Sequence, residues 1–212
     1  MTAAAIEEDA FAPATFFARA RAALARPPDA RAGGDHVLNP DLAADAGVVY
    51  RDAAVLIPVL AREPEATVLL TVRTTNLSAH AGQIAFPGGK IEPDDADPVA
   101  AALREAREEI GLDAGAVTVI GTLRPYLSRT GYRIVPVLAR VEPGGGLTAS
   151  PDEVADVFEV PLRFLMTPAN HRRGTRTFFG RDRYFYEMPF EGRYIWGVTA
   201  GIIRELYEQV YG

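Results

Sequence analysis

The sequence predicts an α+β domain in which a mixed β-sheet lies between helices. Three observations support this prediction. Apolar, partly β-branched runs outnumber the helical segments, and the two kinds of segment follow each other in mixed order. The chain of 212 residues with 48% hydrophobic residues is long and apolar enough to bury one core.

The first quarter of the chain predicts one helix and a loop-rich arm. Residues 13–26 carry apolar side chains at helical spacing, and Pro13 is suited to the first turn. We expect residues 1–50 to form an N-terminal helix and arm that packs on the core. Residues 51–212 are expected to form the main domain, whose compact part begins near Asp52.

Most of the remaining segments predict strands. Their apolar runs have the length and the turn boundaries of strands, and they lie at 53–60, 67–73, 83–86, 116–123, 133–141, 155–160, 175–179, 183–187 and 193–196. Pro87-Gly88-Gly89 predicts a loop.

Three helical segments complete the prediction. Asp97 as the N-cap and Pro98 in the first turn begin a helix that runs to about Ile110 and ends at Gly111. A short helical piece begins at Pro161, and a last helix at 198–210 places its apolar residues on one stripe.

The composition excludes several classes of protein. There is no cysteine, which excludes disulfides, thiol nucleophiles, iron–sulfur clusters and zinc fingers, and the three histidines are far apart in sequence. The net charge of -6 disfavours binding to long nucleic acid. The N-terminus lacks the basic flank of a signal peptide, and the longest apolar run, 53–61, is too short to span a bilayer. We therefore expect a cytoplasmic protein.

The stretch that predicts chemistry is the second half of the helix before Gly111. Glu105, Glu108 and Glu109 stand at i, i+3 and i+4, so they project from one side of a helix, while Leu103, Ala106 and Ile110 form a different stripe. Three neighbouring carboxylates repel each other, and a hard cation such as Mg²⁺ removes that repulsion. A bound metal also makes water a better acid, and a neighbouring carboxylate can take the proton.

The alternative is a solvated acidic face on which Arg104 and Arg107 form salt bridges. The preceding sequence favours the metal site, because Gly88 and Gly89 follow a strand and precede the helix by one loop. Glycine permits backbone to approach closely, and a phosphate would sit at this place.

The run from Gly89 to Leu112 resembles the box motif of the Nudix family, which ends in R-E-U-x-E-E-x-G-U with U aliphatic or small. Arg104 to Leu112 match every fixed position of that second half. The first half differs in two ways. Fourteen residues separate Gly89 from Arg104, where the general pattern has thirteen, and Asp95 stands at the counted place of the motif glutamate.

A second signature resembles the coenzyme A pyrophosphatase subgroup, in which L-L-T-x-R is followed by G-x-x-x-F-P-G-G. This chain has Leu69 to Arg73 and then Gly82 to Gly89. Thr74 replaces the usual Ser or Ala, and Ser78 stands where an Arg is usual. The longer box is also similar to that subgroup, as is the tail segment 194–200.

The resemblance implies a Nudix fold with a loop–helix–loop catalytic motif. It implies hydrolysis of coenzyme A or its derivatives to 3′,5′-ADP and 4′-phosphopantetheine with Mg²⁺ or Mn²⁺. The implied metal ligands are Glu105, Glu108 and Glu109. Arg104 would orient these glutamates by charge-assisted hydrogen bonds, and the backbone of Gly89 would contribute to the metal cluster. The implied partner is a small nucleotide of the coenzyme A class, and many Nudix proteins are homodimers.

Four further residues near the motifs are candidates for substrate or metal contact. Arg73 contacts a substrate phosphate or forms a surface ion pair, and Lys90 contacts a phosphate or a carboxylate or is merely exposed. His80 contacts substrate or fixes its loop by a hydrogen bond. Glu153 helps to bind metal or acts as the base, as a glutamate from such a loop does in several Nudix members, or it is a plain surface acid.

Two features of the C-terminal part have weaker functional interpretations. Arg172, Arg173 and Arg176 could bind the 3′-phosphate of coenzyme A, but a solvated loop is the favoured interpretation. Trp196 is expected in the core, with adenine stacking as the alternative.

Other functions stay open from the sequence. The chain could be a Nudix hydrolase of ADP-ribose or an oxidised nucleotide, a non-catalytic module that senses a nucleotide, or a structural protein with an acidic helix.

Overall fold

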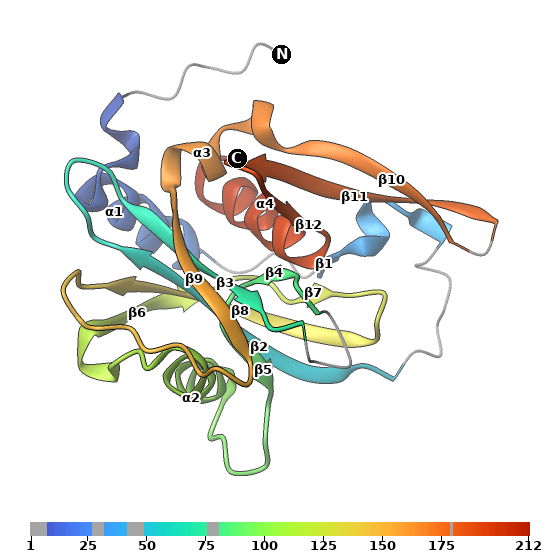
Figure 1. Cartoon of the computed structure of the whole chain (residues 1–212). Coiled ribbons are helices and arrows are strands. Elements are labelled where there is room, and N and C mark those ends of the chain that lie inside the picture. The colour runs from blue at the N-terminus through green and yellow to red at the C-terminus, as the bar shows by residue number, and fades with distance from the viewer. Residues whose placement is uncertain (1–7, 27–31, 42–48, 76–80, 179) are drawn as a thin grey trace.

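A computed structural model describes residues 8–26, 32–41, 49–75, 81–178 and 180–212. The α+β prediction is confirmed: the described chain holds a nine-stranded mixed sheet, a smaller three-stranded sheet and four α-helices (Figure 1). Within the described residues, no helix has both the length and the apolar character needed to cross a bilayer.

The large sheet is built around two long parallel strands, β2 and β8, which pair from Arg51↔Tyr132 to Leu60↔Val141. Its continuous order is β1-β7-β8-β2-β3-β4, with β6 paired to β8, β5 to β2 and β9 to β3. The strands are β1 (Gly33–Gly34), β2 (Arg51–Leu60), β3 (Thr67–Arg73), β4 (Ile84–Ala85), β5 (Gly88–Lys90), β6 (Val117–Thr122), β7 (Tyr126–Leu127), β8 (Tyr132–Val141) and β9 (Val154–Pro161).

The helices cover both faces of the large sheet, as the sequence predicts. They are α1 (Pro13–Leu24), α2 (Pro98–Ile110), α3 (Leu162–Met166) and α4 (Val198–Tyr211), with 3-10 turns η1 (Glu8–Phe11), η2 (Asp35–Val37), η4 (Ala114–Ala116) and η5 (Pro168–Asn170). Figure 1 shows α2 on one face and α1, α3 and α4 on the other.

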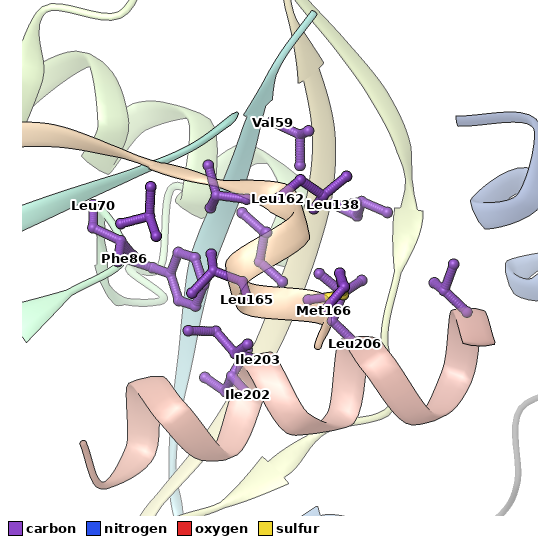
Figure 2. Packing of buried hydrophobic residues seen from close by; sticks show 14 of the residues in the cluster. Val59, Leu70, Phe86, Leu138, Leu162, Leu165, Met166, Ile202, Ile203 and Leu206 are labelled. Carbon is purple, nitrogen blue, oxygen red and sulfur yellow. The ribbon is translucent and has the colours of Figure 1, made fainter. Parts of the chain in front are cut away.

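The two faces correspond to two buried clusters, because side chains of a strand alternate between the faces of a sheet. On β2, Ala53 and Ile57 enter the cluster beneath α1, α3 and α4, whereas Ala54 and Leu56 enter the cluster beneath α2. Figure 2 shows Ile203 of α4 and Leu165 of α3 in the larger cluster. The strand β2, on which α2 packs, is thus buried on both faces of the sheet.

The small sheet is an antiparallel meander of β10 (Arg172–Phe178), β11 (Arg181–Phe190) and β12 (Arg193–Trp196). Its inner side chains Met188 and Ile195 are fully buried and join the larger cluster. The sequence prediction of three strands in this part is confirmed, although the first two are longer than predicted because the hairpin pairs from Arg172↔Glu187 onward.

The described parts of the N-terminal segment contact the rest of the chain. Helix α1 contacts β6 and α4, and β1 pairs with β7. The boundary at residue 50 that the sequence predicts between arm and domain stays a prediction.

The predicted loop at Pro87-Gly88-Gly89 is wrong in part, because Gly88–Lys90 forms strand β5 on the edge of β2. Gly88 has φ +156, and a side chain there would lie 2.7 Å from the backbone Cα of Val55. The glycine therefore permits a close strand pairing that the local sequence, read as a turn, conceals.

Candidate active site

Helix α2 carries the acidic residues, and its position is fixed at both ends. Asp97 accepts a hydrogen bond from the Ala100 amide at 2.8 Å, which caps the N-terminus, and Gly111 ends the helix in the left-handed conformation with φ 65. Ala102 and Ala106 are fully buried against the sheet. Their small side chains let α2 lie close to β2 and β5, so its carboxylates come near the Gly88–Gly89 backbone.

Glu109 is the buried carboxylate of the site, with 2% of its surface exposed. The Gly88 amide donates to its Oε2 at 3.1 Å, and Arg73 Nη1 lies 3.4 Å from its Oε1. Burial raises the pKa of Glu109 to about 7, although the Gly88 amide and the Arg73 charge act in the opposite direction. Glu109 can therefore hold or release a proton near neutral pH.

Glu105 lies one turn earlier and packs against Gly89. A methyl group at Gly89 would be 2.6 Å from Glu105 Cδ, so glycine is what makes room for this carboxylate. Burial raises the pKa of Glu105, Arg104 opposes the rise, and the charges of Glu108 and Glu153 add to it.

Arg104 organises the loop before α2. Its Nε and Nη2 donate to the two carboxylate oxygens of Asp95 at 3.0 and 2.9 Å. Nη1 donates to Glu105 and to Glu108, each at 3.0 Å. The remaining contact goes to the Lys90 carbonyl at 3.2 Å. A guanidinium with this fork geometry fixes several acceptors at once.

Asp95 is a residue whose part in the site the sequence analysis did not assign. It also accepts a hydrogen bond from the Glu92 amide at 2.8 Å, and the Arg104 contact lowers the pKa of Asp95. The signal was present, because Asp95 stands at the counted place of the missing motif glutamate.

The three glutamates of α2 do not point the same way. Glu105 and Glu109 approach the glycines, whereas Glu108 leaves 49% of its side chain exposed and pairs with Arg104. Successive helical residues rotate by about 100°, so Glu109 turns toward the sheet when Glu108 turns away. Arg107 is exposed beyond them.

Glu153 lies across from α2, directly before β9, and is half-buried. Its charge raises the pKa of both Glu105 and Glu109, so it belongs to the same acidic cluster. The Thr74 amide donates to the Glu153 carbonyl at 2.9 Å.

The donor set of this cluster fits a hard divalent cation, because it consists of carboxylate oxygens that repel one another. Among the described residues, however, no three Asp, Glu or His side chains are gathered closely enough to form a complete metal site. Arg104 and Arg73 instead neutralise part of the acidic charge. Binding an ion would therefore require these side chains to rearrange.

The other predicted substrate residues lie in different surroundings. Arg73 Nε is buried and makes no hydrogen bond with any described residue. The Lys90 side chain is exposed at the end of β5, next to the glycines. His80 and Ser78 fall outside the described residues.

The C-terminal arginines are exposed to solvent as expected, but they lie on a strand and not in a loop. Arg172, Arg173 and Arg176 are exposed on β10, where pairing with β11 orders the backbone. The Arg176 guanidinium lies 4.4 Å from the ring centre of Trp196. Trp196 is half-buried on β12 and does not belong to the core. An arginine thus covers the indole.

The chain is similar to known proteins of one family. The family model for the NUDIX domain matches residues 50–179. A protein of Escherichia coli K12 named "Uncharacterized Nudix hydrolase NudL" is 44% identical over 161 residues, which cover 76% of this chain and 83% of that protein.

The chain is also similar to solved structures. DR0079 from Deinococcus radiodurans aligns with a TM-score of 0.50 and 14% identity over 77% of this chain and 88% of its own. The Nudix hydrolase RenU from M. smegmatis aligns with a TM-score of 0.45 and 26% identity over 53% of this chain and 71% of its own.

The family match spans helix α2 and strands β2 to β9 of the large sheet, among them the glycine strand β5. Nudix hydrolases generally use divalent metal ions such as Mg²⁺ or Mn²⁺. The chain belongs to the Nudix hydrolase family, which comprises pyrophosphatase-type enzymes that act on nucleoside diphosphate derivatives.

Proposed function

We propose that this protein hydrolyses the diphosphate bond of coenzyme A or its derivatives to 3′,5′-ADP and 4′-phosphopantetheine. One observation supports the proposal above others: residues of the two sequence signatures meet at one place. Arg73, from the signature at 69–73, contacts Glu109 of the box, and Gly88, from the signature at 82–89, donates to the same carboxylate.

We propose Glu105, Glu108 and Glu109 as ligands of Mg²⁺ or Mn²⁺, with Glu153 as a further acidic group of the site. When bound, the cation would neutralise charge between the carboxylates and the diphosphate and would activate the attacking water. The exposed side chain of Glu108 leaves it free to change partners, whereas buried Glu109 is held by the Gly88 amide.

The residues of the chain have distinct parts in this proposal. Arg73 contacts Glu109 through Nη1 at the long distance of 3.4 Å, and a quarter of its side chain is exposed, so this contact can give way to a phosphate oxygen. Arg104 keeps Glu105 and Glu108 oriented. Lys90 and Gly89 border the place where a phosphate would sit, and His80 stays a candidate for substrate contact.

The chemical step needs one water and one proton acceptor. The water oxygen forms a bond to one phosphorus, the bridging P–O bond breaks, and the bridging oxygen leaves with the other phosphate. A carboxylate takes the proton of the water. Glu109 and Glu153 are the two candidates, because both lie in the acidic cluster, whereas Arg104 holds Glu105 and Glu108.

The test is to incubate the purified protein with coenzyme A and Mg²⁺ and to identify the products by chromatography and mass spectrometry. We expect 3′,5′-ADP and 4′-phosphopantetheine. Consumption of ADP-ribose or an oxidised nucleotide without any 3′,5′-ADP from coenzyme A would contradict the substrate assignment.

Two variants separate an enzyme from a module that only senses a nucleotide. Glu105→Gln and Glu109→Gln should each reduce turnover by orders of magnitude. Glu142→Gln is the control, because Glu142 is an exposed acid that pairs with Arg140 on β8. A sensing module is favoured if the wild type shows no turnover and both variants bind the nucleotide as tightly as the wild type does. The cytoplasmic location and a homodimer stay predictions, the latter testable by light scattering.

A further inference from the structure

We propose that Thr74 is a positioning residue that holds Glu153 at the site. The inference rests on the proposed function, because it concerns the part that Glu153 has there. Thr74 directly follows β3 and the Arg73 that contacts Glu109.

Thr74 binds the backbone on both sides of Glu153. Its Oγ1 donates to the Asp152 carbonyl at 3.0 Å, and its amide donates to the Glu153 carbonyl at 2.9 Å. These carbonyls belong to the two peptide groups that flank the Glu153 Cα. One residue therefore fixes the backbone orientation from which the Glu153 side chain projects.

The turn at 150–153, which carries Glu153, is also hydrogen-bonded to α2. The Ser150 amide donates to the Glu109 carbonyl at 2.8 Å, and Ser150 in turn accepts from the Glu153 amide at 3.1 Å. The turn at 150–153 thus bridges the strand that carries Arg73 and the helix that carries Glu109. Its geometry sets the distance between Glu153 and the other carboxylates.

A β-bulge lies directly beside this contact. Val72 pairs with Asp156 but Arg73 pairs with Val154, so Ala155 is an extra residue in β9. A bulge interrupts the regular ladder and bends the strand. The Thr74 hydroxyl adds a hydrogen bond beyond the interruption, where strand pairing alone no longer determines the backbone.

The hydroxyl is a feature of this chain that its signature does not require. The resembled signature has Ser or Ala at this position, and alanine would keep the amide bond but lose the bond to Asp152. Thr74 is also only 7% exposed, so its hydroxyl has a fixed partner and does not exchange freely with water.

A purely structural hydroxyl would affect stability and nothing else, so the test must separate the two roles. The set of variants is Thr74→Val, Thr74→Ser, Glu153→Gln and the double variant with Thr74→Val and Glu153→Gln. The control is Thr167→Val, because the Thr167 hydroxyl donates to the Arg163 carbonyl at 2.6 Å next to α3, away from α2.

Three properties are measured on each purified full-length variant. They are the Mn²⁺ affinity by calorimetry without substrate, kcat and KM at saturating Mn²⁺, and the thermal midpoint. Kinetics use coenzyme A, or ADP-ribose if the wild type cleaves only that. The Mn²⁺ affinity is measured without substrate, so the test stays informative if coenzyme A is not the substrate.

We expect Thr74→Val to reduce kcat or Mn²⁺ affinity by about tenfold, the equivalent of one lost hydrogen bond. The affected property should be the one that Glu153→Gln impairs. Thr74→Ser should restore it, and the double variant should be no worse than Glu153→Gln, because both changes act through one side chain. Thr167→Val should lower the midpoint and leave kcat and metal affinity unchanged.

Two results would overturn the inference. One is a Thr74→Val protein with the kcat and Mn²⁺ affinity of the wild type. The other is a double variant whose loss is the product of the two single losses, which would show that Thr74 acts independently of Glu153. A wild type that does not cleave coenzyme A would refute the substrate proposal but leave both criteria applicable.

Discussion

Replacing Gly89 by alanine should displace Glu105 without unfolding the protein. The added methyl would lie 2.6 Å from Glu105 Cδ, whereas ordinary contact begins at 3.4 Å. The nearer oxygen Oε1 lies closer still, so the carboxylate must retreat by about 1 Å. The atom that must move is the end of a flexible side chain, and Gly89 does not have a positive φ, so the backbone can accept alanine.

The functional cost follows from this displacement. A misplacement of about 1 Å in a catalytic arrangement can cost on the order of 100-fold in rate. We expect Gly89→Ala to lose about that much in kcat while its thermal midpoint changes little. Gly145→Ala is the matched control, because nothing lies within 4 Å of a methyl group there.

The assay is steady-state hydrolysis at saturating metal, with calorimetry for stability. A shorter acid should relieve the clash, so the double variant with Gly89→Ala and Glu105→Asp should lose less than the product of the single losses. A Gly89→Ala enzyme with wild-type kcat, or a crystal structure of it with Glu105 in its original place, would refute the reasoning.

Three further predictions concern metal, packing and pH. Removing divalent ions with EDTA should stop hydrolysis, and adding Mn²⁺ should restore it. Added Mn²⁺ should also raise the thermal midpoint, because a cation relieves the repulsion between carboxylates. Turnover that persists in EDTA would contradict the metal site. Leu165→Ala, at a fully buried position of α3, should lower the free energy of unfolding by about 2–5 kcal/mol in urea titrations and spare kcat per folded molecule. Burial lowers the pKa of His171 below 6.5. As the pH falls through 6.5, the unfolded chain therefore takes up a proton that the folded protein does not, and the free energy of unfolding decreases. His171→Phe should therefore lose less stability than the wild type between pH 7.5 and 5.5, and parallel urea midpoints across that range would disprove the assignment.

The sequence by itself determined the elements whose signals are local. Asp97, Pro98 and Gly111 predict the ends of α2 correctly, because capping depends on residues within one turn of the helix. The continuous apolar, partly β-branched run at 53–60 likewise predicts β2, and the spacing of the glutamates places them on neighbouring turns of α2.

Only the tertiary structure decided the surroundings of those glutamates. Helical spacing cannot tell which flank of the acidic face meets the sheet, and that contact buries Glu109 and exposes Glu108. Gly88 and Gly89 read locally as a turn but pair with β2 across more than thirty residues of chain. The partners of Thr74 are remote in the same way, at 152 and 153. Hydrogen bonds and burial between distant segments depend on how the chain folds back on itself. A local sequence pattern does not contain that information.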